Sequence, residues 1–157
     1  MALFRFLLLS GLLLPLAALA GGTPSGPGAR AQLVGGTLLE IPSKSGVRVD
    51  LTNNYVLVLR FAKQEMRIPY QKVNTLEYGQ NVSRRYAAAV LISPMLLLSK
   101  SHKHFVTLGY VDGDGRQQAV VLRVEKGDIR AVLTGLEART GRRVEYQDDE
   151  ARKAGKG

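Results

Sequence analysis

The two histidines of this 157-residue chain lie two positions apart, at His102 and His104. On a β-strand this spacing places both imidazoles on one face, an arrangement that can bind zinc. However, the chain contains no cysteine, no carboxylate lies near the pair in sequence, and Lys100 and Lys103 repel a cation. We therefore expect no metal site here. We interpret the histidines as a surface pair that gains positive charge below about pH 6.5.

A second candidate metal site begins at Asp112, where Asp-Gly-Asp-Gly-Arg resembles the start of a calcium-binding loop. The ninth and twelfth positions of such a loop carry a side-chain ligand and a bidentate glutamate, but here they are Val120 and Arg123. A hairpin turn explains the glycines better. The sequence also contains no G-x-S-x-G serine elbow and no Gly-Lys-Ser/Thr phosphate loop. We therefore expect a protein without a cofactor and without enzymatic activity.

The strongest pattern is an uncharged block at 86–99, YAAAVLISPMLLLS, with basic residues on both sides. Bases next to an apolar segment are typical of contact with an anionic membrane, where each contributes about 1 kcal/mol. A full crossing is not expected, because a helix of this length spans about 21 Å against a hydrocarbon core of roughly 30 Å. Pro94 also interrupts a helix. Two interpretations remain: buried core, which we favour, or a short exposed patch that contacts a membrane or a protein partner.

The charge and the N-terminus indicate where the protein works. The formal net charge is +9, which favours anionic partners. Arg5 precedes an almost wholly apolar run at 6–20, and this run ends in Ala18-Leu19-Ala20. This pattern is typical of a Sec-type signal peptide at 1–20, cleaved after Ala20 or retained as an anchor. We expect an exported bacterial protein, periplasmic or extracellular and peripheral or anchored at the membrane, with no nucleic-acid partner.

The rest of the chain reads as a linker, one domain and a tail. Residues 21–36 are rich in Gly, Pro, Ser and Ala and predict a flexible linker, so the domain at 37–147 begins near Thr37. Alternating and β-branched runs predict about seven strands, at 37–41, 47–52, 55–61, 64–68, 73–79, 105–111 and 117–124. Residues 148–157 predict a disordered tail.

A change of period marks one helix near the end of the domain. Ile129, Val132, Leu133 and Leu136 form an apolar helical stripe, which predicts a helix over about 128–140 with Asp128 as N-cap. Strands followed by a single terminal helix indicate an α+β, mainly β fold. We expect a β-roll or partly open barrel capped by this amphipathic helix.

This order of elements, over about 37–143, resembles the pleckstrin-homology-like superfold, including its lipid-binding GRAM branch. The resemblance implies an anionic headgroup held by basic residues on the first strands and their loop. Lys44 lies in such a loop and Arg48 begins the next strand, but the dense Lys/Arg run of that family is absent and Asp50 shares the face of Arg48. The amino-acid sequence around Arg84-Arg85-Tyr86 and at 136–141 is also similar to that of small uncharacterised exported bacterial proteins. This second resemblance implies no activity.

Together these observations predict a basic, non-enzymatic binding module for an anionic membrane or cell-wall surface. The alternative is a protein–protein interaction module that uses the apolar block at 86–99. The candidate binding residues are Arg84, Arg85, Lys100, His102, Lys103, His104, Lys44 and Arg48.

Overall fold

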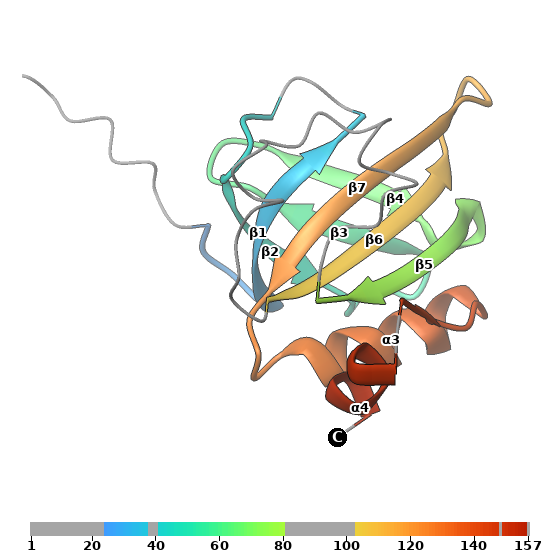
Figure 1. Cartoon of the computed structure of the whole chain (residues 1–157). Coiled ribbons are helices and arrows are strands. Elements are labelled where there is room, and N and C mark those ends of the chain that lie inside the picture. The colour runs from blue at the N-terminus through green and yellow to red at the C-terminus, as the bar shows by residue number, and fades with distance from the viewer. Residues whose placement is uncertain (1–23, 38–40, 81–102, 148, 157) are drawn as a thin grey trace, which may run out of the picture.

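The computed structural model describes residues 24–37, 41–80, 103–147 and 149–156 (Figure 1). Its main feature is an eight-stranded sheet in the order β4-β3-β2-β1-β7-β6-β5-β8. The strands are β1 (Ala29–Gly36), β2 (Gly46–Asp50), β3 (Val56–Arg60), β4 (Glu65–Pro69), β5 (Val73–Gly79), β6 (His104–Val111), β7 (Gln117–Val124) and β8 (Glu145–Tyr146). Neighbouring strands are antiparallel except β8, which runs parallel to β5. Since β4 and β8 are the two edges, the sheet is not closed.

Two α-helices lie together at one end of the sheet (Figure 1). They are α3 (Ile129–Thr140) and α4 (Asp149–Lys156), and a short 3-10 helix, η1 (Tyr70–Lys72), joins β4 to β5. Helix α3 ends at Gly141, whose left-handed backbone (φ 67°) lets its N–H reach the carbonyl oxygen of Glu137. The apolar stripe of α3 is buried against the sheet.

The core lies between the inner face of the curved sheet and α3. Alternate residues of the strands point into it, and Leu57, Leu59, Leu108 and Leu122 are completely buried there. This arrangement confirms the α+β, mainly β class and the partly open sheet with a helix near the C-terminus. The predicted helix over about 128–140 is confirmed as α3.

The prediction of a flexible linker at 21–36 is wrong for residues 29–36, which form β1. This strand lies between β2 and β7 and pairs with both. Leu33 and Val34 are buried, so the backbone pairing on both sides outweighs the glycine- and alanine-rich composition. The ordered domain therefore does not begin at Thr37.

The prediction of a disordered tail at 148–157 is also wrong, because α4 occupies 149–156. Ala151 of this helix is fully buried in the core, and Asp149 pairs with Arg152 at 2.7 Å. The helix packs next to α3 and against β5 and β8. The strand predicted at 37–41 falls mostly on residues 38–40, which lie outside the described residues.

Candidate functional site

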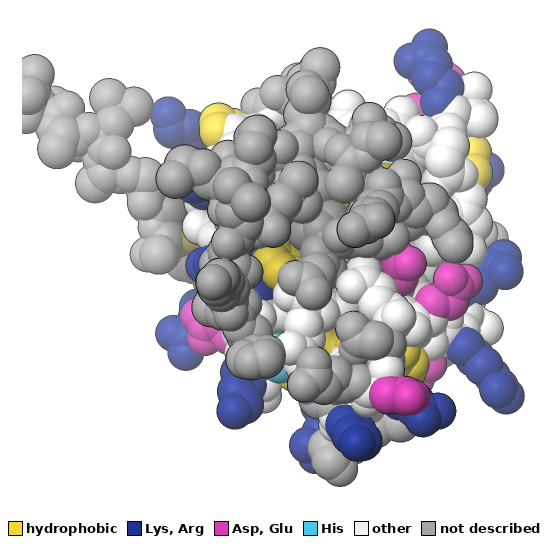
Figure 2. All heavy atoms as spheres, viewed as in Figure 1, with side chains coloured by type: hydrophobic (Ala, Val, Ile, Leu, Met, Phe, Trp, Pro, Cys, Tyr) yellow, Lys and Arg dark blue, Asp and Glu magenta, His cyan; other side chains and the backbone are white. Residues whose placement is uncertain are grey.

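A concave basic site lies where β1, β6 and β7 meet. The cavity there has a volume of about 280 Å³, and we call it the β7-end cavity. Its lining residues are Ala31, Gln32, Lys103, His104, Arg123, Val124, Glu125 and Lys126. Three of these side chains are Lys or Arg, and one is a carboxylate. In Figure 2, dark blue Lys and Arg side chains stand around the outline of the molecule, and several of them lie along its lower rim together with magenta Asp and Glu side chains.

The register of the sheet explains why these bases come together. His104, the first residue of β6, lies directly opposite Val124, and Phe105 lies opposite Arg123. The chain then turns after β7, so that Lys126 comes back beside the start of β6. The result is a cationic concavity formed by segments about twenty residues apart in the sequence.

Two of the predicted binding residues, Lys103 and His104, line this cavity together. Four others, Arg84, Arg85, Lys100 and His102, lie outside the described residues, as does the apolar block at 86–99. The grouping of bases around that block therefore stays a prediction.

His104 is half-buried and contacts a neighbouring strand. Its ring stacks on Tyr78, with 6.0 Å between the centroids, and its Nδ1 lies 2.6 Å from the Tyr78 hydroxyl oxygen. Burial lowers the pKa of His104 below its usual 6.5, and the positive charge of Lys126 lowers it further. The positive charge that the sequence analysis expects below about pH 6.5 is therefore gained only at a lower pH, because burial disfavours the imidazolium. At neutral pH the cavity owes its charge to Lys103, Arg123 and Lys126.

We expect this histidine to make folding stability depend on pH. The unfolded chain takes up a proton near pH 6.5, whereas folded His104 resists protonation until lower pH. Stability is thus fully present above about pH 6.5 and declines as the pH falls from there toward the folded pKa. Urea unfolding at pH 7.5 and pH 5.5 should show a smaller loss of unfolding free energy in His104→Gln than in the wild type. An equal loss in both proteins would contradict this assignment.

The other two predicted binding residues, Arg48 and Lys44, do not line the β7-end cavity. Arg48 lines a neighbouring cavity of about 390 Å³, which shares Ala31 and Glu125 with the β7-end cavity. Lys44 contributes through its backbone: its carbonyl oxygen accepts a hydrogen bond from the Gln32 side chain at 3.0 Å. Lys44 has a left-handed backbone (φ 72°), and its side chain is exposed.

Sequence reasoning missed Arg123, Lys126 and Gln32, which complete the β7-end cavity. Gln32 falls in the segment whose composition predicts a linker, so the sequence does not place it on a central strand. Arg123 interrupts an apolar run of β7, and this single charge on a buried strand was the available signal.

The lining of the β7-end cavity combines three basic side chains with one carboxylate. Within the described residues no group of three or more His, Cys, Asp or Glu could hold a metal ion. In the same part of the chain, no helix is both long enough and apolar enough to cross a membrane.

A scan against models of known protein families finds no match for this chain, and a search of curated proteins finds none either.

Proposed function

We propose that this protein is a non-enzymatic, exported module that binds phosphate-bearing anionic surfaces of the cell envelope through the β7-end cavity. The observation that carries the proposal is the convergence of Lys103, Arg123 and Lys126 on one concave site whose lining includes a single carboxylate. The proposal keeps the resemblance to pleckstrin-homology-like domains as an expectation, for which the structure supplies a sheet-rich fold with a helix near the C-terminus.

The electrostatic contribution of the three bases to the binding free energy can be estimated. Each base held close to an anionic surface contributes about 1 kcal/mol, so three together contribute about 3 kcal/mol. A difference of that size corresponds to a change of roughly one hundredfold in the partition coefficient. The attraction falls off within a Debye length of about 8 Å at physiological salt, so binding should weaken as salt rises.

The test is flotation with phosphatidylglycerol vesicles, with phosphatidylcholine vesicles as the neutral comparison. The wild type should float with the anionic vesicles at about 50 mM salt, where screening is weak. The triple variant Lys103→Gln, Arg123→Gln, Lys126→Gln should lose roughly one hundredfold in partitioning. Circular dichroism of the variant checks that its fold is retained.

A second triple variant, Lys72→Gln, Arg142→Gln, Arg143→Gln, is the matched control. It carries the same net charge, and all three residues are exposed. Two of them follow the far end of α3, whose twelve residues separate them from Lys126 by about 18 Å. If both triple variants lose binding equally, the bases act through net charge alone and the assigned site is wrong.

A further inference from the structure

Three arginines form a row across the outer face of the sheet. Arg30 on β1 lies directly opposite Arg48 on β2, and Arg48 lies directly opposite Arg60 on β3. Directly opposite residues of antiparallel strands share a face, and neighbouring strands are about 4.8 Å apart. Like charges in such positions repel, so each guanidinium needs a counter-charge.

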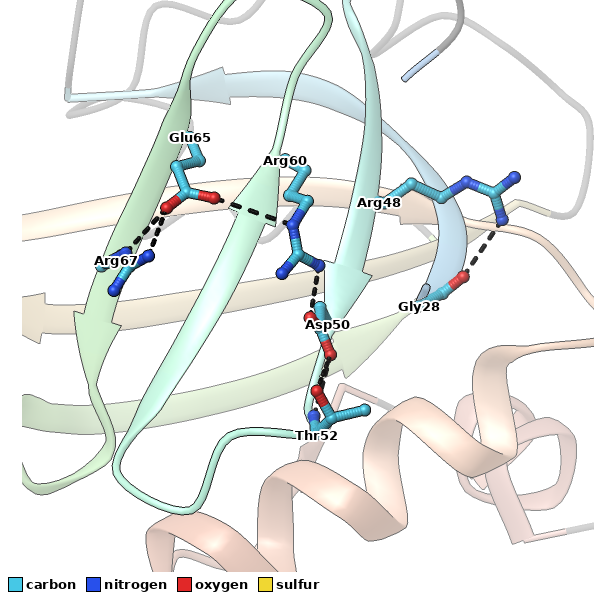
Figure 3. Close-up of polar contacts among 7 residues, drawn as sticks. All are labelled: Gly28, Arg48, Asp50, Thr52, Arg60, Glu65 and Arg67. Carbon is cyan, nitrogen blue, oxygen red and sulfur yellow. Dashed lines mark hydrogen bonds and ion pairs between the residues drawn. The ribbon is translucent and has the colours of Figure 1, made fainter. Parts of the chain in front are cut away.

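Two of the three arginines are paired with a carboxylate that supplies this counter-charge. Arg60 pairs with the buried carboxylate of Asp50, and its Nε lies 3.7 Å from Glu65 (Figure 3). Arg30 pairs with Glu125 at 3.3 Å. Arg48 makes no ion pair within the described part of the chain. Its Nε and Nη1 donate instead to the carbonyl oxygens of Pro24 (3.3 Å) and Gly28 (3.1 Å).

Among the described residues, Arg48 therefore brings a positive charge with no ion-pair partner to the wall of a cavity that Glu125 also lines. Two of the five N–H donors of its guanidinium are used in those bonds, which leaves donors for a ligand. The cavity of about 390 Å³ is also lined by Pro24, Ser25 and Arg30. Gly28, whose carbonyl oxygen accepts one of these bonds, has φ 110° and lies so close to β2 that a Cβ there would be 2.5 Å from the Val49 carbonyl oxygen.

This cavity and the β7-end cavity are adjacent, since Ala31 and Glu125 line both. One contains Arg30 and Arg48, and the other contains Lys103, Arg123 and Lys126. We propose that the two cavities bind successive phosphate groups of one linear polyanion, with Arg30 and Arg48 holding the second group. This inference rests on the proposed function and names its ligand class: a polymer with repeating phosphates.

The inference predicts that affinity rises with chain length, because a second linked group binds at a high effective concentration. Isothermal titration with orthophosphate, tripolyphosphate and long-chain polyphosphate measures this at constant ionic strength. Long chains should bind the wild type at least about one hundredfold more tightly than orthophosphate. Arg30→Gln should lose most of that increase but still float with phosphatidylglycerol vesicles. Arg48→Lys should also reduce the rise of affinity with chain length, since an ammonium group cannot reproduce the forked hydrogen-bond geometry of a guanidinium.

Arg130→Gln is the matched control, because it removes the same charge from an exposed position on α3. If Arg30→Gln and Arg130→Gln behave alike, general charge explains the length effect and the inference is overturned. If vesicles bind but chain length has no effect, the second subsite is wrong and the proposed function stands. If neither vesicles nor polyphosphate binds, both fail.

Discussion

Replacing Leu136 with alanine should lower the free energy of unfolding by about 2 to 5 kcal/mol. Leu136 lies on the inner face of α3, is completely buried, and belongs to the core cluster beneath the sheet. Truncation removes buried apolar surface and leaves a cavity that the surrounding side chains cannot fully close. Because small domains are stable by only about 5 to 15 kcal/mol, the loss is a large part of the total.

Urea denaturation followed by circular dichroism measures the effect, with Tyr55→Ala as the control. The Tyr55 side chain is 79% exposed, so its truncation should change stability by no more than about 0.5 kcal/mol. Equal effects of the two substitutions would mean that α3 does not close the core.

Replacing Asp50 with alanine should cost about 2 kcal/mol. This carboxylate is 2% exposed and accepts bonds from the backbone N–H and hydroxyl of Thr52 and from Arg60 (Figure 3). Removing it leaves the Arg60 guanidinium without its nearest partner. The cost stays below that of a fully buried pair, because Arg60 is 30% exposed and keeps Glu65 at 3.7 Å. Asp114→Ala is the control, since its pair with Arg116 is largely exposed on both sides.

The same carboxylate should make the protein sensitive to acid. Burial raises the pKa of Asp50, but the hydrogen bonds from Thr52 and Arg60 and the charge of Arg60 outweigh burial, so the pKa lies below 3.8. A carboxyl whose folded pKa is depressed stabilises the fold above its unfolded pKa. That contribution is lost as the pH falls from about 3.8 through the folded value. Asp50→Asn should therefore show a smaller decline in unfolding free energy between pH 5 and pH 2.5 than the wild type. Parallel declines would contradict the assignment.

Local patterns predicted the parts of the fold that depend on side-chain periodicity. The alternation in 47–52 and the apolar stripe of α3 each correspond to an element of the structure. Asp128 does precede α3, but its carboxylate accepts a hydrogen bond from the Arg30 backbone N–H at 2.9 Å instead of capping the helix. It thus ties the start of α3 to β1, a role that no local pattern indicates.

The sequence predictions that are wrong concern parts of the fold that depend on contacts between distant segments. Residues 29–36 have the composition of a linker and become a strand only because β2 and β7 pair with them on both sides. The candidate site has the same origin. Lys103 and Lys126 meet because β6 and β7 form a hairpin, and the row of Arg30, Arg48 and Arg60 exists only once the strand register is known.

The most direct test of the central claim is a nuclear magnetic resonance titration of the ¹⁵N-labelled protein with soluble short-chain phosphatidylglycerol. The account predicts that amide shifts concentrate around the β7-end cavity, at Gln32, Lys103, His104 and 123–126. Shifts that instead concentrate around Arg142 and Arg143, or that are absent at saturating ligand, would contradict it.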